Sequence, residues 1–581
     1  MTSVTTSNPK QSLDVMLSDL IFSEFERYGQ QFRAITQSSG RRFETRDWAG
    51  AQEDARRRIE LYDHIVLETI ARIDQVLGGQ VGDEALWGNA RSHYEDRLGD
   101  AIDRELNKTF FNSVSRRRFK TVGVNAALEF AETQLGPTDH VSSRPSILRY
   151  PWTGDLRAIC QQLLQDYSLG LPWEDRQRCV RRVGDAITSQ LARHGGVSGI
   201  RDLEVIRPLF YRNTRAFIVG RICLAEKNLP LLVALENPAP GMRVDWVTTA
   251  VDEASSVFSY SRSYFHADLI SIADAVKFLK GILPHKPVEE LYSILGRAKQ
   301  AKTERYRGIY RHLQRGEDRF VPAPGIKGMV MAVFTLDSYP VVFKVIRDRF
   351  APPKKVTHQD VKDRYLMVYT HNRAGRLVDA QEFKQLRFPL DRFSEEVLTE
   401  LRQECADSVS VVDGQLVIQH LYIERRLEPL NLYLNRVDAE QQRRIVLDYG
   451  QAIRDLAMTD IFPGDLLLKN FGVSRSGRVI FYDYDELCSL DECRFRNVPR
   501  ARYEFEEFGS DVWYEVAPED VFPAQFPSFL GLTPSQLEIF REAHEDLLTA
   551  AFWNGLKERL GAGEVFDVAP YSGSWYGQSW R

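Results

Sequence analysis

The sequence lacks several features that would place the protein in a specialised class. Its 581 residues contain no apolar run long enough to cross a bilayer, and the first eleven lack the apolar core of a signal peptide. Basic residues (76 Lys and Arg) do not outnumber acidic ones (81 Asp and Glu), so no overall positive charge indicates a nucleic-acid-binding protein. We therefore expect a cytoplasmic protein that binds no membrane and no nucleic acid.

Cysteine is also scarce. The six cysteines are scattered, and the two that lie closest, Cys488 and Cys493, have no second pair at the spacing of a zinc site. We interpret all six as reduced thiols, in keeping with a cytoplasmic location. The rest of the composition is ordinary for a globular protein, with 43% hydrophobic and 27% charged residues in a chain long enough for two or more domains.

The first part of the chain is patterned as a helical domain with an inserted sheet. A stripe of apolar residues at helical spacing runs from Tyr62 to Leu77, and we assign it to the core rather than to a ligand site. Short strand-like runs between residues 205 and 248 predict a small antiparallel sheet. Helical patterning then resumes and stops near Gly316, where we place a domain boundary. The predicted domains are residues 1–316 and 317–581.

The most basic short run is Asn112–Lys120, which contains Arg116-Arg-Arg118. The simpler interpretation is a solvated helix face. The alternative is a phosphate or nucleotide effector site, since arginine recognises phosphate well. Any interaction with nucleic acid would rest on this run alone.

The second domain opens with parts in the order of a protein-kinase small lobe. A glycine-containing loop, Ala323–Met329, leads into one strand, and the next strand contains Lys344 within an apolar run. The loop by itself is a weak signal, because it holds only Gly325 and Gly328 and is not a Walker A motif.

Lys344 has two interpretations. It is either an edge-strand lysine with a buried stem or a ligand of nucleotide phosphate, which would supply a counter-charge. The segment 358–370 is predicted to be a helix that could orient this lysine. Asp360 and Asp363 are possible partners, and the sequence does not decide which residue pairs with Lys344. A strong hairpin signal with its turn at Asp413-Gly414 then precedes the segment where a kinase hinge would hold the adenine ring.

The strongest signal in the chain is a catalytic-loop pattern. Asp465 lies in a predicted loop, Asn470 follows five residues later, and Asp483 comes directly after an apolar strand. A protein kinase carries its catalytic Asp, its metal-binding Asn and its second metal-binding Asp in this order. Lys469 is close enough in sequence to Asp465 to reach a γ-phosphate, or it caps a nearby carbonyl.

These motifs closely resemble those of the bacterial isocitrate dehydrogenase kinase/phosphatase family, and the resemblance covers the whole chain. An Asp-Tyr-Asp in place of Asp-Phe-Gly is unusual for a kinase and makes the match specific. The matching motifs are Ala323-Pro-Gly-Ile-Lys-Gly-Met329, Val342-Phe-Lys344, Tyr422-Ile-Glu-Arg-Arg426, Gly464-Asp-Leu-Leu-Leu-Lys-Asn470 and Tyr482-Asp-Tyr-Asp485.

The resemblance implies an α+β fold in which a mostly helical regulatory domain with a small antiparallel sheet precedes a two-lobed protein-kinase-like domain. It implies an enzyme that phosphorylates a serine of isocitrate dehydrogenase, inactivating it, and also removes that phosphate, which switches flux between the citric acid cycle and the glyoxylate bypass. It further implies ATP, with ADP or ATP in the phosphatase reaction, Mg²⁺, AMP as an effector, and a homodimer.

Carried over residue by residue, the resemblance assigns roles to the predicted site. It makes Asp465 the kinase base and Asp379 an active-site acid, and it links Asp485 to phosphate removal. Asp485 replaces the usual glycine and could orient a water, although a structural acid is the simpler interpretation. The assigned residues are Ala323, Pro324, Gly325, Ile326, Lys327, Gly328, Met329 and Lys344 for ATP, Asn470 and Asp483 for metal, and Asp379, Asp465, Lys469 and Asp485 for catalysis.

Two other functions are compatible with parts of the pattern. One is an ATP-dependent kinase of another protein or of a small molecule, without phosphatase activity. The other is a pseudokinase scaffold, which the intact Lys344, Asp465 and Asp483 disfavour. No cluster of His and Asp predicts a two-metal phosphatase, so the economical hypothesis is that the kinase pocket, with bound nucleotide, also carries out the return reaction.

Overall fold

The computed structural model describes most of the chain, and its contacts divide into two compact units. Unit 1 holds the described residues up to Ala254 and those of 264–314, and unit 2 holds those of 255–259 and 315–571. The described residues are 12–78, 82–99, 101–121, 125–130, 146–259, 264–352, 356–371, 373–499 and 514–571.

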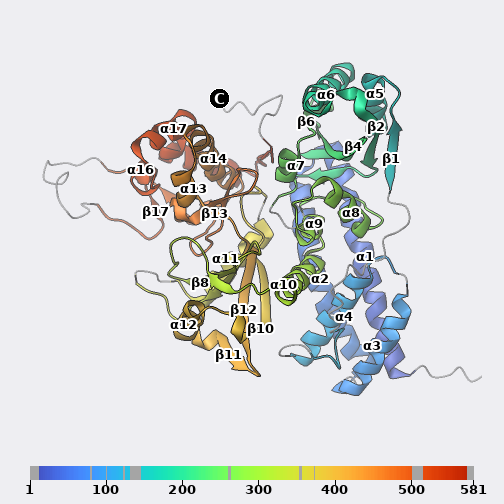
Figure 1. The fold of residues 1–581 in the computed structure, drawn as a ribbon, viewed down its shortest axis with the longest axis vertical. Helices are drawn as coiled ribbons and strands as arrows, with labels where there is room; N and C mark the ends of the chain where they lie inside the picture. The colour runs from blue at the N-terminus through green and yellow to red at the C-terminus, as the bar shows by residue number, and fades with distance from the viewer. Residues whose placement is uncertain are drawn as a thin grey trace, which may run out of the picture. The chain divides into compact units, whose positions relative to one another are not determined.

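Four long helices form the first part of unit 1 (Figure 1, blue). They are α1 (Leu13–Thr45), α2 (Trp48–Leu77), α3 (Glu84–Leu98) and α4 (Arg104–Phe119). Helix α1 packs against α2 and α3, and the predicted stripe of α2 lies in this core, where Tyr62, Val66 and Ile73 are buried. The prediction that this stripe belongs to the core is therefore confirmed.

An antiparallel sheet follows, with two helices against one of its faces (Figure 1, green). Its order is β1-β2-β4-β5-β6, with β3 paired to β4. This confirms the predicted small sheet, but β1 was not predicted and the run after residue 205 is broken at Pro208, which cannot donate a ladder hydrogen bond. The elements are β1 (Ile147–Pro151), α5 (Leu156–Asp166), α6 (Arg176–Leu191), β2 (Ile200–Ile206), β3 (Phe210–Arg212), β4 (Arg215–Leu224), β5 (Asn228–Glu236) and β6 (Arg243–Thr248).

Shorter helices complete unit 1 and connect it to unit 2. The side chain of Ser271 accepts a hydrogen bond from the Asp274 amide and caps α8. No helix in the described ranges is both long and apolar enough to cross a membrane. The helices are α7 (Val251–Val257), α8 (Ile272–Ile282), α9 (Val288–Ile294) and α10 (Ala298–Arg315).

The small lobe of unit 2 is an antiparallel sheet with two helices. Its strand order is β10-β12-β9-β8-β7, and β11 also pairs with β12. The predicted turn is confirmed, since Asp413 and Gly414 both have positive φ (51° and 72°) between β11 and β12. The elements are β7 (Phe320–Pro322), β8 (Met331–Leu336), β9 (Val341–Ile346), α11 (His358–His371), β10 (Gln381–Pro389), α12 (Glu395–Glu404), β11 (Val409–Val412) and β12 (Gln415–Arg425).

The large lobe of unit 2 is mostly helical, and α14 packs against α17 in its core (Figure 1). One face of α14, including Ile445, Tyr449 and Ile453, is buried. Unit 2 therefore has the predicted two-lobed, kinase-like fold. The elements are β13 (Glu428–Pro429), α13 (Leu430–Arg436), α14 (Ala439–Ala457), β14 (Phe471–Val473), β15 (Val479–Phe481), β16 (Arg494–Phe495), β17 (Asp520–Val521), α16 (Phe526–Phe529), α17 (Pro534–His544) and α18 (Ala550–Gly561).

Candidate active site

The loop that carries Asp465 is shaped by a glycine and by hydrogen bonds to the aspartate itself. Gly464 has φ +76°, and a Cβ there would lie 2.3 Å from the carbonyl oxygen of Glu486, so only glycine fits. The Asp465 carboxylate accepts a hydrogen bond from the Leu467 amide at 2.9 Å. The backbone carbonyl of Asp465 accepts one from Asn470 Nδ2 at 3.3 Å. The side chains of Asp465 and Asn470 therefore belong to one compact loop.

The hairpin of β14 and β15 places Asn470 beside the Asp-Tyr-Asp motif. Gly477 forms its turn with φ +73°, as the sequence predicted, and the Tyr482 amide donates a 3.0 Å hydrogen bond to the Asn470 carbonyl. Asp483 is the next residue, so the two predicted metal ligands come from facing ends of the same hairpin. Asn470 is buried, and Asp483 is half-buried.

Lys344 meets this hairpin from the small lobe. Its Nζ donates a 2.7 Å hydrogen bond to the Tyr482 carbonyl and forms a 2.8 Å ion pair with Glu424 of β12. Both side chains of the ion pair are buried, with 8% and 1% of their surface exposed. The structure thus brings Lys344, Asn470 and Asp483 together around the backbone of Tyr482.

Neither of the two acids considered as possible partners of Lys344 pairs with it. Asp360 bonds to Thr357 at the start of α11, and Asp363 accepts a hydrogen bond from Gln359. The counter-charge is Glu424, because the antiparallel register pairs Lys344 with Tyr422 and so puts Glu424, two residues on, on the same face of the sheet. The lysine therefore needs neither an acid of α11 nor a nucleotide to be neutralised.

Helix α11 contacts this cluster through aromatic packing. Tyr365 stacks on Tyr422 with ring centroids 3.9 Å apart and meets the Tyr484 ring edge-on at 5.1 Å. The predicted helix is therefore present, but it packs on the sheet and on the Asp-Tyr-Asp motif without an ion pair to Lys344.

Asp379 and Asp485 are both buried, with 8% exposed. Asp379 accepts a 3.1 Å hydrogen bond from Gln381, and its charge helps to raise the pKa of Tyr484, after burial and the charge of Glu424. The Asp485 carbonyl accepts a hydrogen bond from Arg364 of α11. Asp379 therefore lies close to the tyrosine that separates Asp483 from Asp485.

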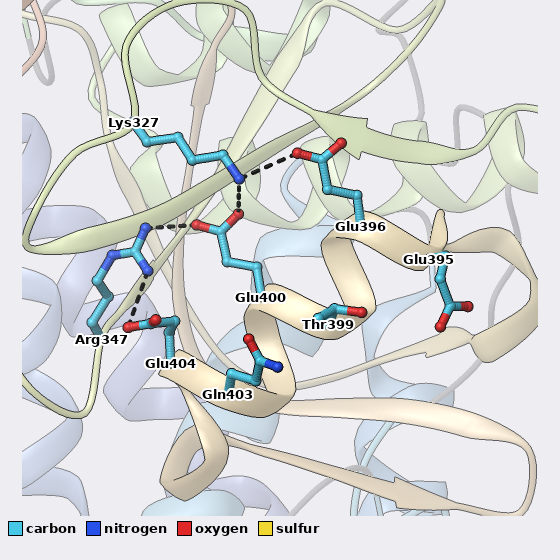
Figure 2. Close-up of a pocket in the computed structure, with 8 residues that line it drawn as sticks. All are labelled: Lys327, Arg347, Glu395, Glu396, Thr399, Glu400, Gln403 and Glu404. Carbon is cyan, nitrogen blue, oxygen red and sulfur yellow. Dashed lines mark hydrogen bonds and ion pairs between the residues drawn. The ribbon is translucent and has the colours of Figure 1, made fainter.

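The glycine-containing loop 323–329 connects β7 and β8, the last two strands of the small lobe's sheet. Gly325 has φ +116°, and a Cβ there would lie 3.3 Å from the Pro429 ring. Lys327 pairs with Glu396 at 3.2 Å and with Glu400 at 3.0 Å (Figure 2). The side chain of Lys327 therefore reaches from its loop to α12. There it lines a hollow of about 480 Å³, and none of the predicted catalytic or metal-binding residues lines this hollow.

The residue types present fit a magnesium ion bound with phosphate. Mg²⁺ takes oxygen ligands and is usually held by one or two carboxylates together with substrate phosphates. Asp483 offers a carboxylate, and the Asn470 amide oxygen makes no hydrogen bond within the described residues. The same part of the chain contains no cluster of three or more His, Cys, Asp or Glu that would hold a metal by protein ligands alone.

The sequence also contains one Cys-x5-Arg spacing, from Cys488 to Arg494, which is the spacing of the nucleophile loop in cysteine phosphatases. The structure does not support that chemistry. A hydrogen bond with Cys493 and burial raise the pKa of Cys488, whereas a nucleophile needs a lowered one. Arg494 is bound to Asp520 at 2.5 Å and is not directed to an anion site.

The basic run on α4 is paired with acidic side chains of unit 1. Arg116 bonds to Glu129 at 2.9 Å, Arg117 pairs with Asp63, and Arg118 pairs with Asp74 at 3.1 Å. These contacts favour the simpler interpretation of the run, a solvated helix face.

Comparisons with known proteins agree with this architecture. Two family models match, the regulatory domain of isocitrate dehydrogenase kinase/phosphatase over residues 18–317 and its kinase domain over 318–573. Curated proteins named isocitrate dehydrogenase kinase/phosphatase are similar over nearly their whole length. The protein of Xanthomonas campestris pv. campestris (strain 8004) is 45% identical, with 95% of this chain and 96% of the relative covered. That of Anaeromyxobacter sp. (strain Fw109-5) is 44% identical over 95% and 96%, and that of Methylibium petroleiphilum 38% over 98% and 93%. The chain belongs to the isocitrate dehydrogenase kinase/phosphatase family.

Proposed function

We propose that the protein phosphorylates isocitrate dehydrogenase on a serine with ATP, inactivating it, and removes the same phosphate to reactivate it. This activity would set the flux between the citric acid cycle and the glyoxylate bypass. The observation that carries the proposal is the convergence of Lys344, Asn470 and Asp483 on the Tyr482 backbone, next to the loop of Asp465. A pseudokinase would not need this set of groups intact.

In the forward reaction the residues of the site position the serine hydroxyl and neutralise the charge of the nucleotide phosphates. Asp465 accepts the proton of the serine hydroxyl while that oxygen attacks the γ-phosphorus, and the bond to the β-phosphate oxygen breaks to leave ADP. Lys344, fixed by Glu424, holds phosphate oxygens of the nucleotide. Lys469, whose ammonium makes no contact within the described residues, is on the same loop as Asp465 and would meet the γ-phosphate. Magnesium held by Asn470 and Asp483 would offset charge on the transferred group.

Phosphate removal uses the same pocket in this proposal. Asp485 orients a water whose oxygen attacks the phosphorus of phosphoserine while the bond to the serine oxygen breaks. Asp465 passes the proton that the water gives up to the leaving serine oxygen, so that serine and free phosphate are the products. Asp379 serves as a further acid of the site, and bound ADP or ATP keeps the pocket assembled. The absence of an activated cysteine at Cys488 supports a mechanism through water.

The rest of the chain has regulatory and nucleotide-binding roles. Residues 1–316 form the regulatory domain, with AMP as its effector, and residues 317–581 form the catalytic domain. The loop from Ala323 to Met329 covers the nucleotide phosphates. The protein acts as a homodimer in the cytoplasm.

The test uses purified protein, isocitrate dehydrogenase, magnesium and γ-labelled ATP. We expect label to be incorporated into the dehydrogenase and then released as free phosphate after a chase with ADP or AMP. Asp465→Ala should abolish both, and Asp485→Asn should lower release more than incorporation. Asp491→Ala, at an exposed acid of the same unit, is the matched control and should keep both rates.

Each outcome discriminates between functions. Incorporation without release would leave a protein kinase alone. Absence of incorporation, with ATP binding intact, would show that the substrate is another molecule. Equal losses of both rates in Asp485→Asn would remove the separate role of Asp485 while leaving the bifunctional activity in place.

A further inference from the structure

The segment that carries Asp379 is an irregular stretch of backbone inside the protein. Every residue from Ala374 to Ala380 is buried. Buried backbone N–H and C=O groups need hydrogen-bond partners, and an irregular segment cannot find them within itself. What supplies those partners therefore decides where Asp379 lies.

One end of this segment is fixed to the large lobe. The Arg376 guanidinium bonds to Asp455 at 2.7 Å and to Asp448 at 2.8 Å and 2.9 Å, and the Arg376 carbonyl accepts a hydrogen bond from the Phe481 amide. These contacts hold the chain three residues before Asp379.

The other contact comes from the tyrosine of the Asp-Tyr-Asp motif. The Tyr484 hydroxyl accepts a 2.8 Å hydrogen bond from the Val378 amide and donates a 2.9 Å hydrogen bond to the Val378 carbonyl. One hydroxyl thus satisfies both backbone groups of the residue next to Asp379. A phenylalanine, as in Asp-Phe-Gly, would satisfy neither.

We propose that the Tyr484 hydroxyl is a positioning group that fastens Asp379 to the Asp483–Asp485 motif. The inference rests on the proposed function, because it concerns how an acid of that site is held. The hydroxyl also lies 3.4 Å from the Phe481 carbonyl. Since Tyr484 lies between Asp483 and Asp485 in the chain, its two hydrogen bonds with Val378 set the placement of all three acids together. This gives the tyrosine of the motif a task that the phenylalanine of other kinases does not have.

Tyr365 provides a matched control. It is buried in the same aromatic stack, 5.1 Å from the Tyr484 ring, but among the described residues its hydroxyl hydrogen-bonds to the Met331 sulfur alone, at 3.4 Å. Tyr484→Phe and Tyr365→Phe each delete one buried hydroxyl from that stack. Only the first releases the Asp379 segment.

The experiment measures incorporation and release of label for wild type, both Phe variants and Asp379→Asn. We expect Tyr484→Phe to lower kcat about 10- to 100-fold in the same reaction or reactions that Asp379→Asn lowers, as is typical when a supporting hydrogen bond is removed. The KM for Mg-ATP should change by less than about threefold, and Tyr365→Phe should stay within about twofold of wild type. In the Asp379→Asn background, Tyr484→Phe should add little, since the hydroxyl acts through that acid.

Three results would overturn the inference. These are equal losses in the two Phe variants, a full additional loss of Tyr484→Phe in the Asp379→Asn background, and fast hydrogen exchange of the peptide that contains Val378 in the wild-type protein. The exchange measurement needs no variant, so it decides the matter even where Tyr484→Phe does not fold. A wild-type protein that incorporates no label would refute the proposed function instead, and slow exchange at Val378 would still support the structural half of the inference.

Discussion

Two lysines of the small lobe were both predicted to bind nucleotide, and they differ in how deeply their side chains are buried. Lys344, on β9, is 8% exposed and pairs with Glu424, which is 1% exposed. Lys327, in the loop before β8, is 59% exposed and shares Glu396 and Glu400 of α12 (Figure 2). The first ammonium is fixed from two sides, and the second is held only by side chains that water can replace.

The difference teaches which groups of the site are preorganised. A buried charge must keep its partner, because removing one member leaves the other uncompensated in a poor solvent. An exposed pair contributes little and exchanges easily with water or with another anion. We therefore expect Lys344 to hold its position before nucleotide binds, whereas Lys327 can leave α12 for a phosphate.

The largest expected effect concerns the cluster around Arg376, whose side chain is 4% exposed while that of its partner Asp448 is 26% exposed. Asp448 accepts two hydrogen bonds from Arg376 and a 2.6 Å hydrogen bond from the Val479 amide. Asp448→Asn should lower the free energy of unfolding by about 3 kcal/mol at pH 7, as measured by denaturant unfolding. The control is Glu542→Gln, which breaks the exposed pair that Arg443 of the same helix forms, and its effect should be much smaller.

The pH dependence of this effect has a definite sign. Burial alone would raise the pKa of Asp448, but the charge and hydrogen bonds of Arg376 lower it below its ordinary value of 3.8. The carboxylate therefore contributes stability above about pH 4, and this contribution is lost as the pH falls through the lowered value of the folded state. The stability difference between wild type and Asp448→Asn should shrink below pH 4, and a constant difference would show that Arg376 does not act through the charge of Asp448.

Removing the buried lysine of the site is the next largest change. Lys344→Met should lower incorporation of label about 100-fold or more, because a fixed positive charge at the phosphates is lost. The variant should still fold when combined with Glu424→Gln, since the double change removes both charges of the pair. If Lys344→Met alone kept its rate, Lys344 would be a structural lysine that pairs with Glu424 and takes no part in phosphate binding.

The order of the kinase parts could be predicted from the sequence, because it depends on local patterns. The hairpin turn at Asp413-Gly414, the turn at Gly477 and the helix after residue 358 are each specified by residues within a few positions of one another. The partner of Lys344 could not be predicted in this way. Glu424 lies eighty residues further along the chain, and only the register between β9 and β12 brings it to the same face of the sheet as the lysine, diagonal to it.

The position of Asp379 could not be predicted from local sequence patterns either. Asp379 was found only through the family resemblance, because no spacing links it to Asp483 in the sequence. Its placement depends on Tyr484 and on a buried irregular segment, and neither has a periodic pattern. Likewise, nothing in the loop motif indicates that Lys327 pairs with α12, since the glutamates of that helix look like an ordinary solvated face.

The ion pair inside the small lobe gives a sharper test of the comparison. Glu424→Gln should raise the KM for Mg-ATP or lower kcat by about tenfold in total, because Lys344 loses its charged partner but keeps the Tyr482 carbonyl. Asp360→Asn and Asp363→Asn, on α11, are the matched controls and should leave both constants unchanged. A larger loss in either control than in Glu424→Gln would mean that α11 moves to the lysine in the working enzyme.

The smallest expected effect belongs to the exposed lysine. Lys327→Ala should change the KM for Mg-ATP by less than about fivefold, because its pairs with Glu396 and Glu400 are screened by water. Glu400→Gln should have a larger effect on stability than Glu396→Gln, since Glu400 also bonds to Arg347 at 2.6 Å and that arginine is only 10% exposed. A rise in KM of tenfold or more for Lys327→Ala, with Glu396→Gln lowering KM, would show that the lysine leaves α12 to bind phosphate. The acidic helix would then compete with the nucleotide for Lys327, and only the preorganisation of Lys344 would separate the two lysines.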